Sequence, residues 1–510
     1  MSLVSVTTKL GALEGEALSV NGQTVLSFRS IPYAAPPVGA RRFRAPEPPL
    51  PWTHKRDART RGPTAPQILG VMRDLPEQSE DCLHLNVWTP ALTGARPVIA
   101  FFHGGAFVTG SSQHTMYDAH VLAQRGDVVV VSFNYRLGAL GYADPGALGE
   151  ASFEADTNNG LRDQIAALQW IREHIDAFGG DPDDVTLLGQ SAGAMSVSTL
   201  LGVPSAYPLY RRVIAQSGGA HHVTSREHSA RMAKLLLDAL KISPRELHKL
   251  RELPFAQLAA AQAECMRSFI LVGPDDRPLY SGGMTLIPVV DGELIPRPPI
   301  DTLASGQGSA APLLTGSNRD ENRFWTVLID SSKLQTLDET ALHKIVDRRL
   351  PDDAERVIAA YRARMPSAKA WEVYSAIETD RMFRLPATRI AQARAPHDQR
   401  TFLYAFDFVG PLFDGELGAC HTMEVPFVFG IVDAGFGRVF TGGGPEAQTL
   451  RDRMLDAWLS FVRTGDPSCA SLGPWPAYGP TPDTQAMRLG REPALQPLHH
   501  PGDPLWSELV

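Results

Sequence analysis

Continuous apolar runs along the chain predict strands that are buried on both faces of a sheet. These runs occupy residues 98–102, 128–133, 185–188, 213–215, 313–314 and 402–406. Between two of them, apolar side chains recur every three to four residues over 161–178, which predicts a helix that ends at Gly179-Gly180. Buried strands that alternate with such a helix predict an α/β fold, with a large, mostly parallel central sheet flanked by helices.

Two longer segments, about 221–277 and 332–399, are helical by pattern and interrupt the series of strands. Helices in such a place form either a lid over a site or a cover on the outside of the sheet, and the pattern favours neither. The sequence has no internal repeat, no low-complexity tract and no linker between two compositions. We therefore expect a single domain over 1–510 that carries the two segments as helical insertions.

Composition narrows the class of protein. Hydrophobic residues at 43% and charged residues at 20% provide a large core and exclude wholesale disorder. A net charge of −8 argues against nucleic acid or an anionic membrane as a partner. Four cysteines without a Cys-x-x-Cys pair indicate neither a disulfide scaffold nor a zinc site. The first residues lack a signal-peptide pattern and no apolar run approaches 18 residues, so we expect a cytoplasmic protein without a membrane span.

The run 185–188 leads into Gly189-Gln190-Ser191-Ala192-Gly193, which precedes a stretch suited to a helix. A Gly-x-Ser-x-Gly between strand and helix is typical of the nucleophile elbow of α/β-hydrolases, because small neighbours allow the strained turn that presents the serine. The helix N-terminus also offers N–H groups to a developing oxyanion. The alternative is a glycine-rich turn whose serine only caps the helix.

The run 98–102 ends in His103-Gly104-Gly105-Ala106-Phe107. His-Gly-Gly after a buried strand supplies oxyanion-hole amides in esterases, since glycine lets the backbone approach the substrate closely. We assign the donors to the amides of Gly105, Ala106 and Ala192, and we place Phe107 in the substrate pocket. His103 is expected to brace the loop rather than act as a base, and the alternative is a flexible loop with an incidental histidine.

The acid and the base of a serine triad must follow the elbow, because hydrolases of this kind have the order serine, acid, histidine. The run 313–314 leads into a loop with Asp320 and Glu321, and the pattern does not choose between them. Among fifteen histidines, His421 stands out because it lies in a glycine-containing loop after the run 402–406.

Over nearly its whole length the chain resembles the type-B carboxylesterase family, which includes bacterial para-nitrobenzyl esterases and the cholinesterases. Besides the elbow, the resemblance rests on SEDCLHLNV at 79–87, NYRLG at 134–138 and FGGDP at 178–182. It implies an α/β-hydrolase fold with Glu321 as the triad acid, His421 as the base and Ser217 as a brace for the acid. It also implies that Phe324 and Trp325 line the substrate pocket. The alternative is that these two side chains only pack in the core.

The chain departs from the family pattern in four respects. Gln190 replaces a glutamate, which we expect to remove a structural ion-pair partner but not a catalytic group. Asn322 replaces a glycine after the acid. Cys82 matches a half-cystine of secreted members, but no cysteine precedes it, so we expect no bridge there. Met72 stands where cholinesterases hold choline over a tryptophan by cation–π attraction, so choline specificity is not expected.

The resemblance implies a serine carboxylesterase that hydrolyses uncharged esters, with short to medium acyl groups or aromatic alcohols, through an acyl-Ser191 intermediate. Such a small-molecule ester hydrolase requires no metal or organic cofactor, and we expect a monomer or weak oligomer. A catalytically silent adhesion or scaffold protein on the same fold is the alternative from another class, and the presence of the serine, acid and histidine argues against it. Hydrolysis of an amide, carbamate or thioester stays open.

Overall fold

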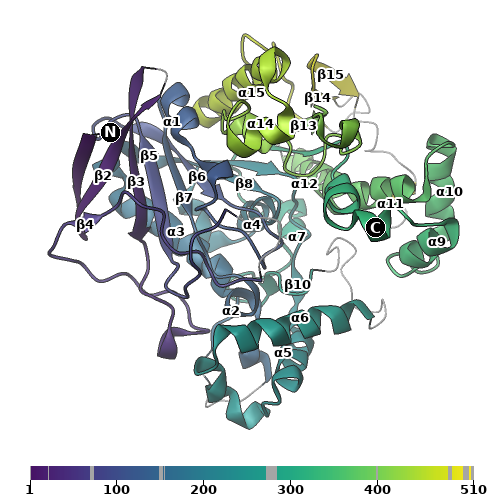
Figure 1. Cartoon of the computed structure of the whole chain (residues 1–510), viewed down its shortest axis with the longest axis horizontal. Helices are drawn as coiled ribbons and strands as arrows, with labels where there is room; N and C mark the ends of the chain where they lie inside the picture. Colours follow the sequence, from purple (N-terminus) through teal and green to yellow (C-terminus); the bar gives the residue numbers. More distant parts are fainter. Residues whose placement is uncertain are drawn as a thin grey trace.

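The computed structural model describes residues 2–20, 22–68, 74–148, 153, 155–271, 284–397, 400–479, 485–497 and 505–506. Among these residues, thirteen strands form one large sheet (Figure 1). In chain order they are β1 (Ser2–Thr8), β2 (Gly11–Val20), β3 (Gln23–Pro32), β4 (Arg56–Asp57), β5 (His84–Thr89), β6 (Arg96–Phe102), β7 (Val129–Phe133), β8 (Gly180–Gln190), β9 (Arg212–Gln216), β12 (Leu313–Asn318), β13 (Thr401–Phe406), β14 (Gln485–Leu489) and β15 (Ala494–Pro497). The two short strands β10 (Thr224–Ser225) and β11 (Val289–Val290) pair with each other in parallel.

The middle of the large sheet is parallel and its edges are antiparallel. The order is β1-β2-β3-β5-β7-β6-β8-β9-β12-β13-β14-β15, with β4 beside β2, and every neighbouring pair from β7 to β14 runs in parallel. Each apolar run of the sequence coincides with one of these central strands to within one residue, so the predicted strands and the mostly parallel central sheet are confirmed. Because the central strands are parallel, the loops that follow them open on one edge of the sheet.

Helices cover both faces of the sheet. They are α1 (His120–Gly126), α2 (Gly138–Tyr142), α3 (Asn159–His174), α4 (Ala192–Leu200), α5 (Arg226–Leu240), α6 (Phe255–Leu271), α7 (Pro299–Ala304), α8 (Ser331–Leu334), α9 (Glu339–Asp347), α10 (Ala354–Arg364), α11 (Ala370–Thr379), α12 (Leu385–Arg394), α13 (Val425–Val428), α14 (Gly435–Thr441) and α15 (Gly444–Thr464). The helix predicted over 161–178 is α3 with the turn after it, and it ends at Gly179, whose φ is 75°.

Strand β6 shows how the two faces are used. Val98, Ala100 and Phe102 belong to one buried cluster with residues of α3 and α4, and Ile99 and Phe101 belong to a second cluster with residues of α1, α13 and α15. All five side chains are at most 2% exposed. The uninterrupted apolar run therefore reflects burial on both faces, as its pattern predicts.

The segment 221–277 contains α5 and α6, and the segment 332–399 contains α9 to α12. Figure 1 shows α5 and α6 as a lobe below the sheet and α9 and α10 at the right-hand margin of the molecule. Residues 272–277 and 398–399 lie outside the described residues, as does Met72. None of the helices in the described part of the chain has the length and apolarity that a membrane crossing needs.

The NYRLG segment after β7 anchors the neighbouring loop after β6. The Tyr135 hydroxyl donates to the carbonyl oxygen of His103 at 2.8 Å, and the two rings stack with centroids 4.3 Å apart. Arg136 holds the segment to α3 by donating to both carboxylate oxygens of Asp163, at 2.8 and 2.7 Å. Both partners of this ion pair are buried. The motif therefore has a structural use, which is to fix the loop that reaches the candidate site.

We expect Asp163→Ala to lower the free energy of unfolding by about 3–5 kcal/mol, because it leaves the Arg136 guanidinium buried without a counter-charge. Urea unfolding at neutral pH measures the loss. As a control, Lys234→Ala breaks an exposed pair with Asp238 on α5, and it should cost less than about 1 kcal/mol. Equal losses in the two variants would contradict the assigned importance of the buried pair.

Candidate active site

Ser191 occupies a strained turn between β8 and α4. Its φ of 57° and ψ of −125° lie where residues other than glycine are rarely found. A Cβ on Gly189 would lie 2.2 Å from the carbonyl oxygen of Gly193, and one on Gly193 would lie 2.0 Å from that of Phe102. Both glycines are therefore required by close backbone contacts. The Ser191 side chain does not cap α4, so the alternative of a simple capping serine is wrong.

The loop after β6 lies directly against this turn. Gly105, Ala106 and Phe107 have positive φ values of 124°, 52° and 63°, and a Cβ on Gly104 would lie 2.8 Å from the Cβ of Ser191. No acceptor among the described residues takes a hydrogen bond from the amides of Gly105, Ala106 or Ala192. Three unpaired donors thus come from the two elements that surround the serine, which is the arrangement that an oxyanion requires.

His103 braces this loop, as expected from the sequence. Its Nδ1 atom lies 2.9 Å from the carbonyl oxygen of Gly104, and its ring is stacked on Tyr135. Burial lowers the pKa of His103 to about 4, so the imidazole is neutral at physiological pH. Phe107 is fully buried and packs edge-on against Tyr142. The ring of Phe107 therefore has no exposed surface toward a ligand in this structure, and its placement in the substrate pocket stays a prediction.

The loop after β12 brings a carboxylate to His421. The Nδ1 atom of His421 lies 2.5 Å from Oε2 of Glu321, and Oε1 of the same carboxylate accepts from the amide of Asn318 at 2.8 Å. Glu321 is fully buried and His421 is 3% exposed. Asp320 instead pairs with Arg319 and accepts from the amide of Ala419. The geometry therefore separates the two carboxylates that the sequence left open.

The comparisons with known proteins agree with this geometry. Residues 2–501 match the model of the carboxylesterase family. The chain belongs to this family. It is 37% identical over 480 residues to the para-nitrobenzyl esterase of Bacillus subtilis (strain 168), covering 93% of this chain and 92% of that protein. It is 36% identical over 464 residues to the phenmedipham hydrolase of Pseudarthrobacter oxydans, covering 88% and 89%.

Solved structures show the same fold. A carboxylesterase of Geobacillus stearothermophilus superposes with a TM-score of 0.85 at 37% identity, over 99% of this chain and 100% of that chain. A structure described as a thermophilic PNB esterase gives a TM-score of 0.84 at 33% identity, with 99% of each chain covered. The protein is therefore a carboxylic ester hydrolase of the α/β-hydrolase fold, as the sequence resemblance implied.

In this carboxylesterase the second ring nitrogen of His421 faces Gln190. The Nε2 atoms of the two side chains are 3.3 Å apart, and Gln190 is 1% exposed. The Ser191 hydroxyl makes no hydrogen bond to any described residue. We expected the change from glutamate to Gln190 to remove only a structural ion-pair partner. The structure instead places the Gln190 amide on the imidazole.

Sequence reasoning missed two polar residues beside the acid. The side chain of Asn318 donates to the Cys420 carbonyl at 2.7 Å and to Oε2 of Glu424 at 2.6 Å. Glu424 is fully buried and also accepts from Gln216 at 3.1 Å. Burial, together with the nearby charge of Glu321, raises the pKa of Glu424 to about 7. A carboxyl group three residues after a candidate base is a weak signal in sequence, because only the folded chain shows that it is buried.

Ser217 was expected to brace the acid. Its φ is 61°, and its amide donates to the carbonyl oxygen of Gly316 at 2.9 Å. The buried Ser217 hydroxyl has no hydrogen-bond partner among the described residues. The amide of Asn318, rather than Ser217, is the group that contacts the carboxylate of Glu321 in this structure.

Three aromatic rings surround the imidazole of His421. The ring centroids of Phe324, Trp325 and Phe383 lie 6.0, 5.1 and 4.8 Å from that of His421. Trp325 and Phe383 also stack on each other, with centroids 5.8 Å apart. Phe383 lies in the segment just before α12 and carries no motif, so the sequence did not indicate it. The imidazole of His421 therefore lies in an aromatic, uncharged environment on this side.

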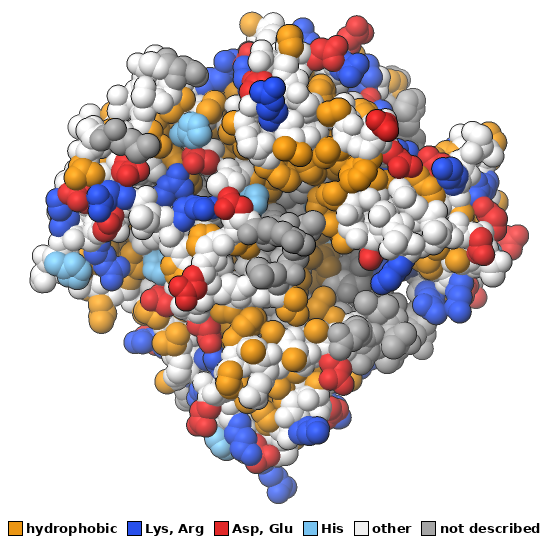
Figure 2. Space-filling view, viewed as in Figure 1, with side chains coloured by type: hydrophobic (Ala, Val, Ile, Leu, Met, Phe, Trp, Pro, Cys, Tyr) orange, Lys and Arg blue, Asp and Glu red, His pale blue; other side chains and the backbone are white. Residues whose placement is uncertain are grey.

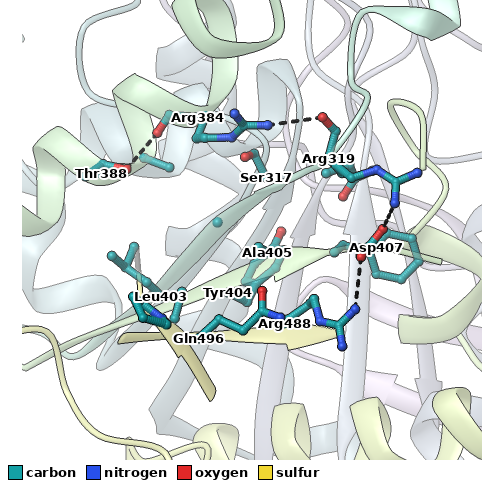
Figure 3. Close-up of a pocket in the computed structure, with 16 residues that line it drawn as sticks. Ser317, Arg319, Arg384, Thr388, Leu403, Tyr404, Ala405, Asp407, Arg488 and Gln496 are labelled. Atoms are coloured by element: carbon teal, nitrogen blue, oxygen red, sulfur yellow. Dashed lines mark hydrogen bonds and ion pairs between the residues drawn. The ribbon is translucent and has the colours of Figure 1, made fainter. Parts of the chain in front are cut away.

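A separate cavity of about 260 Å³ lies between α12 and the strands β12 to β15 (Figure 3). Asp407 pairs there with Arg319 and Arg488, and Arg384 donates to the Arg319 carbonyl at 3.1 Å. Neither the elbow serine nor the acid–histidine pair contributes to its lining. Because its arginines are paired with carboxylates, this cavity offers no strong charge to a ligand.

The raised pKa of Glu424 predicts a pH dependence of stability. Between about pH 4.5 and 7 the folded chain keeps a proton on Glu424 that the unfolded chain releases, so this carboxyl lowers stability as pH rises. Glu424→Gln has no carboxyl group to ionise at this position, so it does not lose this stability as pH rises. The unfolding free energy of the variant relative to that of the wild type should therefore increase by up to about 3 kcal/mol between pH 5 and pH 8. Urea unfolding across this range measures it. The exposed change Glu416→Gln is the control, and parallel curves for all three proteins would contradict the assignment.

Proposed function

We propose that Ser191, Glu321 and His421 form the catalytic triad, with the amides of Gly105, Ala106 and Ala192 as the oxyanion hole. The observation that carries the proposal is the 2.5 Å contact between the buried Glu321 carboxylate and Nδ1 of His421, at the edge of the sheet where the elbow presents the serine. Membership in the carboxylesterase family supports it.

The reaction is acyl transfer to water in two steps. The Ser191 hydroxyl gives its proton to Nε2 of His421 as its oxygen attacks the ester carbonyl carbon. The negative charge that forms on the carbonyl oxygen accepts hydrogen bonds from the three amides. The bond to the alcohol then breaks and the alcohol takes the proton from His421. In the second step water gives a proton to His421 as its oxygen attacks the acyl-Ser191 ester. His421 then returns the proton to the Ser191 oxygen as the bond to the acyl group breaks, which releases the carboxylic acid.

Glu321 supports both steps by fixing the ring. Its carboxylate accepts from Nδ1, which leaves the lone pair on Nε2 and stabilises the imidazolium when the proton arrives. The second carboxylate oxygen is held by the Asn318 amide, so the acid cannot turn away. Ser217 lies on the neighbouring loop after β9, and we propose that it braces the acid loop through its backbone contact with Gly316.

The substrate class follows from the surroundings of the base. Phe324, Trp325 and Phe383 present uncharged rings to His421, and Figure 2 shows apolar side chains gathered around a hollow in the middle of the face that it displays. Uncharged esters with short to medium acyl groups or aromatic alcohols fit such surroundings. The names of two relatives, para-nitrobenzyl esterase and phenmedipham hydrolase, support esters with an aromatic part.

The remaining features of the proposal concern the whole protein. The chain acts as one catalytic domain over 1–510, with helical insertions at about 221–277 and 332–399. It works in the cytoplasm as a monomer or weak oligomer, on a small-molecule ester and with no metal or organic cofactor. The negative net charge of −8 supports the absence of a nucleic-acid partner.

Ser191→Ala tests the nucleophile. We expect turnover of para-nitrophenyl acetate to fall to within roughly 10³–10⁴ of the uncatalysed rate, because only the oxyanion hole and binding then remain. Circular dichroism checks that the fold is intact. An organophosphate should label Ser191 of the wild type, as seen by peptide mass spectrometry. Substantial residual turnover would place the nucleophile elsewhere, and absence of labelling would likewise contradict Ser191 as the nucleophile.

Trp325→Ala tests the pocket. Removal of a ring beside the base makes room for a longer acyl chain, and each added methylene is worth about 1 kcal/mol or more in an apolar pocket. We expect the kcat/KM of para-nitrophenyl octanoate relative to the acetate to rise about tenfold. The ratio of two substrates is insensitive to a loss of folded enzyme. An unchanged ratio over the acyl series would show that Trp325 only packs in the core.

A further inference from the structure

Gln190 reaches two parts of the proposed catalytic machinery at once. It is the last residue of β8 and is buried, and its Nε2 atom lies 3.3 Å from Nε2 of His421. Its Oε1 atom points the other way, because a Cβ built on Gly104 would lie 2.7 Å from it. The carboxamide therefore lies between the base and the loop that carries the oxyanion donors.

The hydrogen positions follow from the partners. Nδ1 of His421 faces a carboxylate oxygen of Glu321, so it carries the proton of a neutral imidazole and donates it. Nε2 then holds a lone pair. The amide nitrogen of Gln190 has protons but no acceptor lone pair, so in this contact it donates to Nε2. That lone pair is the one that must receive the proton of Ser191.

The groups around the imidazole show why the absence of charge on the Gln190 amide matters. Glu321 faces His421 from the loop after β12, and Glu424 faces it from the start of α13. The rings of Phe324, Trp325 and Phe383 carry no charge, and burial raises the pKa of the neighbouring Cys420 thiol, which therefore stays neutral. A carboxylate at position 190 would be a further acidic group beside the ring and would favour the protonated imidazole.

We propose that Gln190 is a positioning residue whose side-chain amide occupies Nε2 of His421 in the free enzyme until substrate enters, and which keeps a further negative charge away from the imidazole. The Ser191 hydroxyl has no hydrogen bond in this arrangement, so the serine–histidine contact forms when the amide leaves Nε2. This inference rests on the proposed triad.

Gln190→Glu tests whether an uncharged side chain at position 190 matters for the imidazole of His421. The side chain has the same shape and adds a negative charge about 3 Å from Nε2, which should move the acid limb of the kcat/KM profile up by about 1–2 pH units. Activity lost at neutral pH should return at alkaline pH. Gln164→Glu is the matched control: Gln164 is also fully buried, but it donates to Ser196 on α4 rather than to the base. Its profile should keep the wild-type limb.

Gln190→Met tests the occupation of Nε2. Methionine has a similar length and no N–H donor, so the free enzyme no longer has to break a hydrogen bond before the serine engages the base. We expect kcat/KM at the alkaline plateau to rise about two- to tenfold, the value of one net hydrogen bond. The change should appear in KM with kcat unchanged, because the amide has already left Nε2 in the bound state. Gln190→Asn, which is too short to reach Nε2, should behave in the same way.

The outcomes separate the inference from the proposed function. A lower kcat in both the Met and Asn variants would overturn the inference, because the amide would then assist the transition state. A Gln190→Glu profile that coincides with the wild type would also overturn it. If one of these two results is found and Ser191→Ala is inactive, the proposed triad is retained and only the role assigned to Gln190 is wrong. If Ser191→Ala retains full activity, the proposed function itself falls.

Discussion

The carboxylate of Glu321 is the group on which the arrangement of the site depends. A fully buried carboxylate is costly unless hydrogen bonds satisfy it. Its two oxygens are satisfied by the His421 ring and by the Asn318 amide. These partners come from positions about one hundred residues apart, so the loop after β12 and the loop around His421 must meet. Two further hydrogen bonds between Asp320 and Ala419 tie the same loops together.

The other half of the site is held by backbone contacts rather than by charge. The elbow requires glycine at positions 189 and 193, since a side chain there would collide with carbonyl groups of the neighbouring turns. The loop after β6 is pinned by Tyr135, which stacks on His103, and by the buried pair of Arg136 with Asp163. Unpaired amides are thus presented by rigid surroundings, which is the condition under which they stabilise a developing negative charge without reorganisation.

Acidic groups are unusually dense beside His421. Glu424 lies three residues beyond it, and its carboxyl group accepts hydrogen bonds from Asn318 and Gln216. Its pKa of about 7 means that the neutral form is a major species at physiological pH. A carboxamide at position 190 is consistent with this local balance, since it adds hydrogen-bonding capacity without another negative charge. Gln190 therefore adds no charge next to the imidazole of His421.

The sequence by itself was sufficient for the central strands, the tight turn at Ser191 and the glycine loop after β6, because each depends on local patterns. Apolar runs indicate burial on both faces, and glycines at fixed spacing indicate turns that exclude a side chain. Resemblance to a family supplied Glu321 and His421, which the pattern alone did not select. Only the tertiary structure decided which side chains meet. It buried Phe107 behind its loop, brought Phe383 and Glu424 to the imidazole and placed the Gln190 amide on Nε2. Contacts between distant segments have no local signature, since they arise from packing of the complete chain.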